Sequence, residues 1–468
     1  MEITLLGLLL IPIGIIFLFL PSKYLFFSTL FFAPFTAASV LNIESITFGL
    51  QPSYYFGILF ILKETLNFFF KKKFTFAKPN IFFIWFLFFS LISLIFPIIF
   101  ENKIEVFWQD VGFYPLTLTV HNFTQLFYLI FIFLIYIYSK NFFQQSQNKQ
   151  NLFKEIINIQ IFSVIFVVFW GLLQIAGGYF SFNLPSLFSN RLGVSINNPP
   201  VHGFFRMNSV FPEPSMLAFY LASMLGLFLF IPSNFIKIGK PVLLFAIIIG
   251  GVLSISSSFL LGLGIICLLL GINFFIFLFS KKRVRKWILK KKAIIQGGII
   301  LFIIIIFLIV FGNKPISLVS ALFEITIGKL QLQEFSGIER KQQFLFGLDL
   351  FKESNFLGVG YGTVRITDLF STLLANVGII GFVLFIGLVI KILIDLLKVI
   401  KSGNGIIKGY LFFFITLFII ALISVPEPYF LFIWMNFGIA EALISYFKRS
   451  DLSCFCQEGI IIKDYEKD

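Results

Sequence analysis

Charged side chains are scarce in this chain. They make up 12% of its 468 residues, whereas hydrophobic residues make up 59%. A soluble domain carries roughly 25% charged residues, so the composition excludes an ordinary soluble enzyme. Many apolar runs approach the roughly 20 residues that cross a bilayer core as a helix. Because helices satisfy their own backbone hydrogen bonds in lipid, and the runs lack the alternation of barrel strands, we expect an all-α, polytopic transmembrane helix bundle.

Cysteine and histidine are also rare, with three and two residues respectively. Cys267 lies inside an apolar run, while Cys454 and Cys456 form a C-F-C pattern that matches no zinc or redox spacing. The sequence shows no cluster of acidic and histidine side chains with metal-ligand spacing. We therefore expect no disulfide framework, no metal site and no cofactor.

The apolar runs predict about 12–13 spans in one integral membrane domain over residues 1–468. The first run has no basic residues before it and no small-residue cleavage site, so we interpret it as a retained span. The candidate spans are 3–20, 24–42, 53–70, 80–100, 123–139, 158–179, 215–232, 241–253, 259–279, 293–312, 369–390, 409–425 and 430–447.

Basic segments predict the orientation, because cytoplasmic loops carry the excess of Lys and Arg. The basic block KKRVRKWILKKK is part of the net charge of +14, and its place between two apolar runs favours a cytoplasmic loop over a nucleic-acid site. The N-terminus is then outside and the C-terminus inside. The segments predicted inside are 71–73, 140–154, 237–240, 281–292 and 391–408, and those predicted outside are 43–52, 101–122, 180–214, 254–258, 313–368 and 426–429.

The two longest outward loops, 180–214 and 313–368, are expected to carry short surface helices. Both contain arginine, which runs against the topological bias and calls for an explanation. The first loop ends in FRMNSVFPEPS, where Pro214 restricts Glu213 to an extended conformation and suits a first helical turn. Glu213 is therefore either a capping carboxylate paired with Arg206 or a general base at a helix mouth, with a pKa raised by burial.

The second loop contains an amphipathic pattern. Phe344, Leu345, Leu348 and Phe351 predict a helix lying on the membrane surface, with Arg340 near its start. The stretch GVGYG (358–362) follows. It lacks the Lys-Ser/Thr of a phosphate loop, which favours a tight glycine turn, and a backbone nest for a lipid-linked phosphate is the alternative.

Two sets of residues resemble a known family. The first is R-x-x-S-x-F-x-E-P-S, formed by Arg206, Ser209, Phe211, Glu213, Pro214 and Ser215. The second is Arg340, followed by FLGVGYG and then LLANVGIIGFVLF (373–385). In this order and in outward loops, they resemble the bacterial O-antigen polymerase and O-antigen ligase superfamily over residues 158–390.

The chain departs from the ligase branch of that family. Ligases carry a histidine, often as His-Asn, before an L-A-E-x-G-x-x-G stretch. Here the corresponding residues are Thr367 and Asp368, and Asn376 replaces the glutamate. The departure favours the polymerase branch.

The resemblance implies a metal-independent glycosyltransferase of the bacterial cytoplasmic membrane that polymerises polyprenyl-diphosphate-linked oligosaccharide repeat units at the outer face. It implies membrane lipids as surroundings, a chain-length regulator protein as a partner, and no nucleic acid. A diphosphate leaving group needs cations, and arginine offers bidentate, charge-assisted hydrogen bonds. The expected roles are diphosphate binding by Arg206 and Arg340, with Arg191 and Arg365 in reserve; general base catalysis by Glu213, or alternatively Asp368; and glycan positioning by Asn208 and Tyr361.

Two alternatives stay open. The first is an O-antigen ligase or oligosaccharyltransferase that passes the glycan to lipid or protein, which differs in its acceptor. The second is a flippase for lipid-linked oligosaccharide. A flippase predicts charged residues that line a path inside the spans, whereas here the charges gather in loops and near span ends.

Overall fold

The computed structural model describes residues 1–46, 48–71, 77–108, 112–182, 184–194, 200, 203–279, 326–328, 331, 335–400 and 405–449. The described chain is mostly helical. Its helices are α1 (Leu5–Phe19), α2 (Lys23–Phe32), α3 (Pro52–Lys71), α4 (Ile81–Ser93), α5 (Phe96–Ile99), α6 (Val120–Gln145), α7 (Lys149–Phe180), α8 (Pro214–Phe228), α9 (Lys240–Leu253), α10 (Ser257–Phe279), α13 (Phe335–Glu353), α14 (Leu369–Ile400), α15 (Gly405–Ser424) and α16 (Leu431–Arg449).

Five helical segments within the described residues are long and apolar enough to cross a membrane. They are Ile81–Ile99, which joins α4 and α5, and the helices α6, α7, α14 and α15. Shorter apolar helices accompany them: α1, α2, α8, α9 and the Ser257–Asn273 part of α10. These findings support a membrane protein. The predicted span 293–312 lies outside the described residues.

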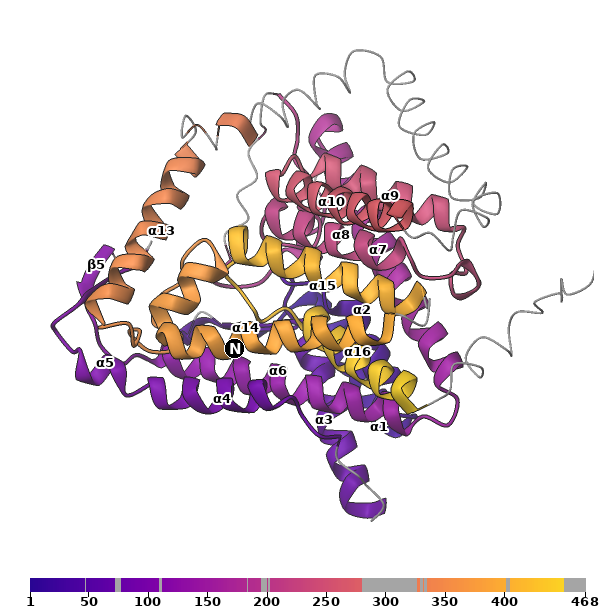
Figure 1. The fold of residues 1–468 in the computed structure, drawn as a ribbon, viewed down its shortest axis with the longest axis horizontal. Helices are drawn as coiled ribbons and strands as arrows, with labels where there is room; N and C mark the ends of the chain where they lie inside the picture. The colour runs from indigo at the N-terminus through magenta and orange to yellow at the C-terminus, as the bar shows by residue number, and fades with distance from the viewer. Residues whose placement is uncertain are drawn as a thin grey trace, which may run out of the picture.

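The helices pack as neighbours that are often distant in sequence. α16 lies on α6, α15 lies on α8 and α14, and α14 also packs along α4. In Figure 1, α4, α6, α14 and α16 extend in a similar direction, with α7, α8, α9 and α10 grouped on one side. The helix α13 contacts α14 and stands near the end where α14 begins.

Two small sheets add to the predicted all-α architecture. β1 (Glu2–Ile3), β2 (Leu41–Ile43) and β3 (Phe48–Leu50) form one antiparallel sheet, and β4 (Glu105–Trp108) pairs with β5 (Gly112–Pro115). Pairing of β1 with β2 brings the N-terminus to the end of the bundle that also holds residues 33–46 and 48–50.

The predicted span 24–42 is wrong in its second half. α2 ends at Phe32, and Pro34 follows, which has no backbone N–H for a helical ladder. The chain then pairs with other loops: the Ala37 N–H donates to the Val210 carbonyl at 3.0 Å, and Leu41–Ile43 forms β2. The residues after α2 therefore build the loop end of the bundle.

The two long loops differ in structure. In the described part of 180–214, the regular element is a single 3-10 turn, Ser186–Phe188, so the expected surface helix is reduced to one turn. In 313–368, the predicted helix is present as the 19-residue α13. Gly347 and Leu350 of α13 are buried, whereas Leu345 is 47% exposed.

The opposite end of the bundle contains a buried ion pair. Glu441 Oε2 accepts from Lys140 Nζ at 2.7 Å and from the Tyr136 hydroxyl, and Glu441 Oε1 accepts from Asn80 Nδ2 at 3.0 Å. Lys140 also donates to the Lys78 carbonyl at 2.6 Å. The two charged side chains are only 10% and 13% exposed. This network joins α6 to α16.

The network predicts an order of stabilities. Glu441→Leu leaves the Lys140 charge without its counter-ion and removes the acceptor of two neutral donors, so we expect a loss of roughly 3–5 kcal/mol. Lys140→Met keeps both neutral donors on Glu441 and should cost less. Thermal unfolding of the purified variants in detergent measures both, and equal or reversed losses would contradict the assigned network.

Candidate functional site

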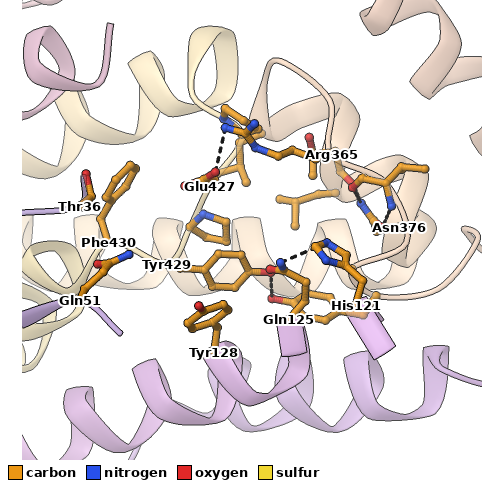
Figure 2. Close-up of a pocket in the computed structure, with 18 of the residues that line it drawn as sticks. Thr36, Gln51, His121, Gln125, Tyr128, Arg365, Asn376, Glu427, Tyr429 and Phe430 are labelled. Atoms are coloured by element: carbon orange, nitrogen blue, oxygen red, sulfur yellow. Dashed lines mark hydrogen bonds and ion pairs between the residues drawn. The ribbon is translucent and has the colours of Figure 1, made fainter. Parts of the chain in front are cut away.

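A cavity of about 110 Å³ opens at the loop end of the bundle. It lies where the loops before α3, α6, α14 and α16 meet, and we call it the Arg191–Arg365 cavity. Its volume suits a charged head group rather than a whole oligosaccharide. Its polar wall includes His121, Gln125, Tyr128, Arg191, Arg365 and Glu427, and Figure 2 shows how most of these side chains converge.

An ion pair occupies one side of this cavity. Arg365 Nη2 lies 2.8 Å from Glu427 Oε1, and the two side chains are 49% and 33% exposed. The Glu427 charge raises the pKa of the Arg365 guanidinium; burial opposes the rise, and the Glu213 charge adds to it. Figure 2 shows the pair as a dashed contact at the cavity wall. Arg365 is therefore held as a cation beside a carboxylate that a ligand can replace.

Arg191 supplies a second cation to the cavity. Its Nη1 donates to the Thr36 carbonyl at 3.0 Å, while its Nε is buried and has no hydrogen-bond partner within the described part of the chain. The side chain passes close to β3: a Cβ added at Gly49 would lie 2.6 Å from Arg191 Cγ. Gly49 therefore makes room for Arg191, whose guanidinium also interacts with the Tyr128 side chain.

Tyrosines form the deeper wall of the cavity. The Tyr429 hydroxyl donates to the Tyr361 hydroxyl at 2.8 Å, and burial raises the pKa of Tyr361 above its usual range. The rings of Tyr54 and Tyr128 meet edge to face at 5.2 Å, and Tyr128 lies 5.7 Å from Tyr429. These side chains stay neutral and offer hydroxyl groups and ring faces, the two surfaces that proteins use against sugars.

The segment that carries Tyr361 and Arg365 is fixed by side-chain amides. Asn376 of α14 accepts from the Val364 N–H at 3.0 Å and donates to the Val364 carbonyl at 2.8 Å. Asn122 of α6 donates to the Tyr361 carbonyl at 3.0 Å. Asn376 is thus a structural link between α14 and the cavity.

The GVGYG stretch is a packed glycine turn. Gly358 and Gly360 have φ of +86° and +106°, and a Cβ at either would lie 2.5–2.6 Å from neighbouring atoms. Its backbone donors are used within the protein: the N–H groups of Val359 and Gly360 donate to the carbonyls of Ala375 and Asn376. The N–H groups of Gly358 and Tyr361 donate to Ser354 and Ser93. The interpretation as a phosphate nest is wrong, because these amides are not available to a ligand.

A second cavity of about 440 Å³ lies between α13 and the end of α15. Arg340 and Lys341 line it together with Asp368 and apolar side chains of Phe344, Phe370, Leu422 and Ile423. Arg340 Nη1 donates to the Ser424 carbonyl at 3.4 Å. We call this the Arg340 cavity, and it combines cations with an apolar wall.

Asp368 caps α14. Its Oδ1 accepts from the Ser371 N–H at 2.7 Å and its Oδ2 from the Ser371 hydroxyl at 2.6 Å. Burial raises the pKa of Asp368, while these hydrogen bonds and the Arg340 charge oppose the rise. Both oxygens are engaged in an N-terminal cap of a kind that stabilises helices.

The loop before α8 holds the remaining predicted site residues, Arg206, Asn208 and Glu213. Arg206 Nε donates to the Ser254 carbonyl at 3.5 Å, and Asn208 is buried with its Nδ2 donating to the Phe211 carbonyl at 3.2 Å. Glu213 is exposed at the N-terminus of α8 and accepts from the Ser215 hydroxyl at 3.0 Å. Asn208 thus serves the local turn.

The structure brings the reserve arginines, Arg191 and Arg365, into one cavity with Tyr361, while Arg340 and Asp368 share the other. Arg206 and Arg340 are linked indirectly. Arg206 contacts Ser254 just before α10, the Ser258 hydroxyl of α10 lies 3.1 Å from the Ser424 hydroxyl, and the Ser424 carbonyl accepts from Arg340. Their convergence on a single diphosphate stays a prediction.

Sequence reasoning missed Glu427 and His121. Glu427 lies in the short link 426–429 between two predicted spans, for which only an outward location was predicted. The repetition of Pro-Glu-Pro at 212–214 and 426–428 was the available signal. His121 had no motif around it.

No family model matches the chain, and no curated protein matches it. Within the described residues, no group of three or more His, Cys, Asp or Glu side chains is placed to hold a metal ion.

The close approach of Gly49 to Arg191 predicts the effect of one methyl group. Gly49→Ala should displace Arg191 at a cost of about 1–3 kcal/mol, and lower the affinity for inorganic diphosphate roughly tenfold, which corresponds to about 1.4 kcal/mol. Gly264→Ala, where an added Cβ meets no atom within 4 Å, is the matched control. Titration calorimetry on the purified protein measures the affinity. Unchanged diphosphate binding by Gly49→Ala would remove Arg191 from the site.

Proposed function

We propose that this protein polymerises oligosaccharide repeat units that are linked to a polyprenyl diphosphate, at the outer face of the bacterial cytoplasmic membrane. One repeat-unit lipid is the donor, and a second provides the acceptor hydroxyl. The growing glycan is transferred to the acceptor, and polyprenyl diphosphate is released.

The observation that carries this proposal is the pair of arginines in one cavity at the end of apolar helices. Arg191 and Arg365 both line the Arg191–Arg365 cavity, and Arg191 keeps a buried donor with no partner in the described chain. Planar guanidinium groups favour phosphate oxygens through bidentate hydrogen bonds. An anion site beside membrane helices fits a ligand with a phosphate head and a lipid tail.

The chemistry required is displacement at a sugar carbon. The acceptor oxygen forms a bond to the anomeric carbon, the bond from that carbon to the phosphate oxygen breaks, and the electron pair leaves with the diphosphate. Guanidinium groups stabilise the charge that develops on the leaving group, a type of effect worth several kcal/mol in a partly desolvated site. The acceptor proton must pass to a carboxylate near the cavity.

The carboxylates differ in their suitability for that role. Asp368 uses both oxygens to cap α14, which argues against the alternative base assignment. Glu213 is exposed, and its charge acts on Arg365, so it lies in the electrostatic range of the cavity. Glu427 contacts Arg365 directly.

The Arg340 cavity supports a reaction between two lipid-linked substrates. Arg340 and Lys341 offer cations, and the apolar wall of Phe344, Phe370 and Leu422 offers a surface for prenyl carbon. The segment 365–368 separates it from the Arg191–Arg365 cavity, because Arg365 lines one and Asp368 the other. The two cavities thus suit a donor and an acceptor.

Reconstitution tests the proposal. Purified protein in liposomes that contain a polyprenyl-diphosphate-linked repeat unit should yield a ladder of polymer on a gel, together with free polyprenyl diphosphate. Arg191→Lys should slow the reaction by a factor on the order of 10², because the ammonium group of lysine cannot make the bidentate hydrogen bonds of a guanidinium. Lys352→Ala is the control, since Lys352 is 66% exposed and pairs with Asp349.

Two other outcomes of the reconstitution would contradict the proposal, and each would indicate a different function. Transfer of a single glycan to another lipid or to protein, without a ladder, would indicate a ligase or an oligosaccharyltransferase. Movement of the lipid-linked unit across the bilayer without a new glycosidic bond would indicate a flippase.

A further inference from the structure

The same three-residue sequence leads into two helices of the bundle. Pro212-Glu213-Pro214 leads into α8, and Pro426-Glu427-Pro428 leads into α16. Aromatic side chains of the two helices meet, with the Tyr220 and Phe432 rings 5.1 Å apart, and the charges of Glu213 and Glu427 both act on Arg365. The fold therefore brings two proline-flanked carboxylates to one region.

The two carboxylates differ in their relation to Arg365. Both charges favour the Arg365 cation, but Glu427 contacts it at 2.8 Å and lines the cavity. Among the described residues, those that line the cavity do not include Glu213. Glu427 is the carboxylate that a ligand in the cavity would meet.

Two hydrogen bonds fix the backbone just after Glu427. Trp434 Nε1 donates to the Pro428 carbonyl, and the Tyr54 hydroxyl donates to the Tyr429 carbonyl at 3.0 Å. The two prolines fix φ on either side of Glu427. The carboxylate can therefore exchange partners by side-chain rotation while its main chain stays in place.

We propose that Glu427 is the internal anion that the substrate diphosphate displaces from Arg365, and that the displaced carboxylate accepts the proton of the acceptor hydroxyl. This inference rests on the proposed function and assigns a catalytic residue to it. Glu427 takes the place of Glu213 as the base.

The exchange links donor binding to the position of the base. In the structure, Glu427 Oε1 lies 2.8 Å from Arg365 Nη2, so the carboxylate is held by the guanidinium. Once the diphosphate takes Arg365, the carboxylate is released and can turn to the acceptor hydroxyl. The acceptor O–H bond breaks as the new C–O bond forms, the proton goes to Glu427, and the diphosphate leaves with the electron pair of the broken bond.

Binding of inorganic diphosphate tests the exchange without the reaction. Glu427→Gln removes the competing internal anion while keeping the side-chain size, so its affinity for diphosphate should rise about tenfold. Glu213→Gln is the matched variant from the other Pro-Glu-Pro, and it should change the affinity by less than twofold. Weaker or unchanged binding by Glu427→Gln would overturn the exchange.

Polymer formation tests the base. Glu427→Gln should bind diphosphate more tightly and yet form no ladder, an opposition that a merely structural role does not produce. Glu427→Asp keeps the carboxylate and should retain polymerisation at a reduced rate. Asp349→Asn is the control for activity, because Asp349 is exposed and pairs with Lys352. A full polymer ladder from Glu427→Gln would overturn the base assignment. An equal loss of polymer formation in the Gln and Asp variants, together with poor diphosphate binding by both, would also overturn it. Tighter diphosphate binding by Glu427→Gln, with no glycosidic bond formed by the unaltered protein, would overturn the proposed function and the base role while retaining the exchange.

Discussion

The side chain of Asn376 fixes the segment on which the candidate site depends. Its amide pairs with both backbone polar groups of Val364, at 2.8 and 3.0 Å. A chain that leaves a helix near lipid must satisfy its backbone groups elsewhere, and this one residue of α14 does so for the neighbour of Arg365. The position of Arg365, and through it the ion pair with Glu427, follows from that link.

Scarcity of charge makes the location of each charge informative. In the described chain, one end of the bundle holds the buried Lys140–Glu441 pair, and three further donors or acceptors surround the two groups. The loop end holds Arg191 and Arg365, where donor capacity remains and a cavity adjoins it. A closed network stabilises the fold, whereas an open one is suited to a ligand. The physical contrast between the two ends underlies the functional proposal.

Hydropathy predicted most of the helices, because length and apolar character are local properties. It failed at residues 33–42, where Pro34 stops α2 and strand pairing takes over, and the span 293–312 lies outside the described residues. The site was less accessible to sequence reasoning. Motifs directed attention to Arg206 and Arg340, but the cavity is built around Arg191 and Arg365, whose meeting depends on contacts such as Gly49 against Arg191. Glu427 was missed because a short link between spans carries no pattern of its own, and only its repetition of Pro-Glu-Pro relates it to Glu213.

We propose that a lipid-linked diphosphate binds between Arg191 and Arg365 by displacing Glu427. A cryo-electron microscopy map of the protein in lipid nanodiscs with a bound polyprenyl diphosphate would show this exchange. We expect phosphate density between the two guanidinium groups, with the Arg365–Glu427 ion pair opened. Density for the diphosphate at Arg206 and Arg340, with that ion pair intact, would contradict it.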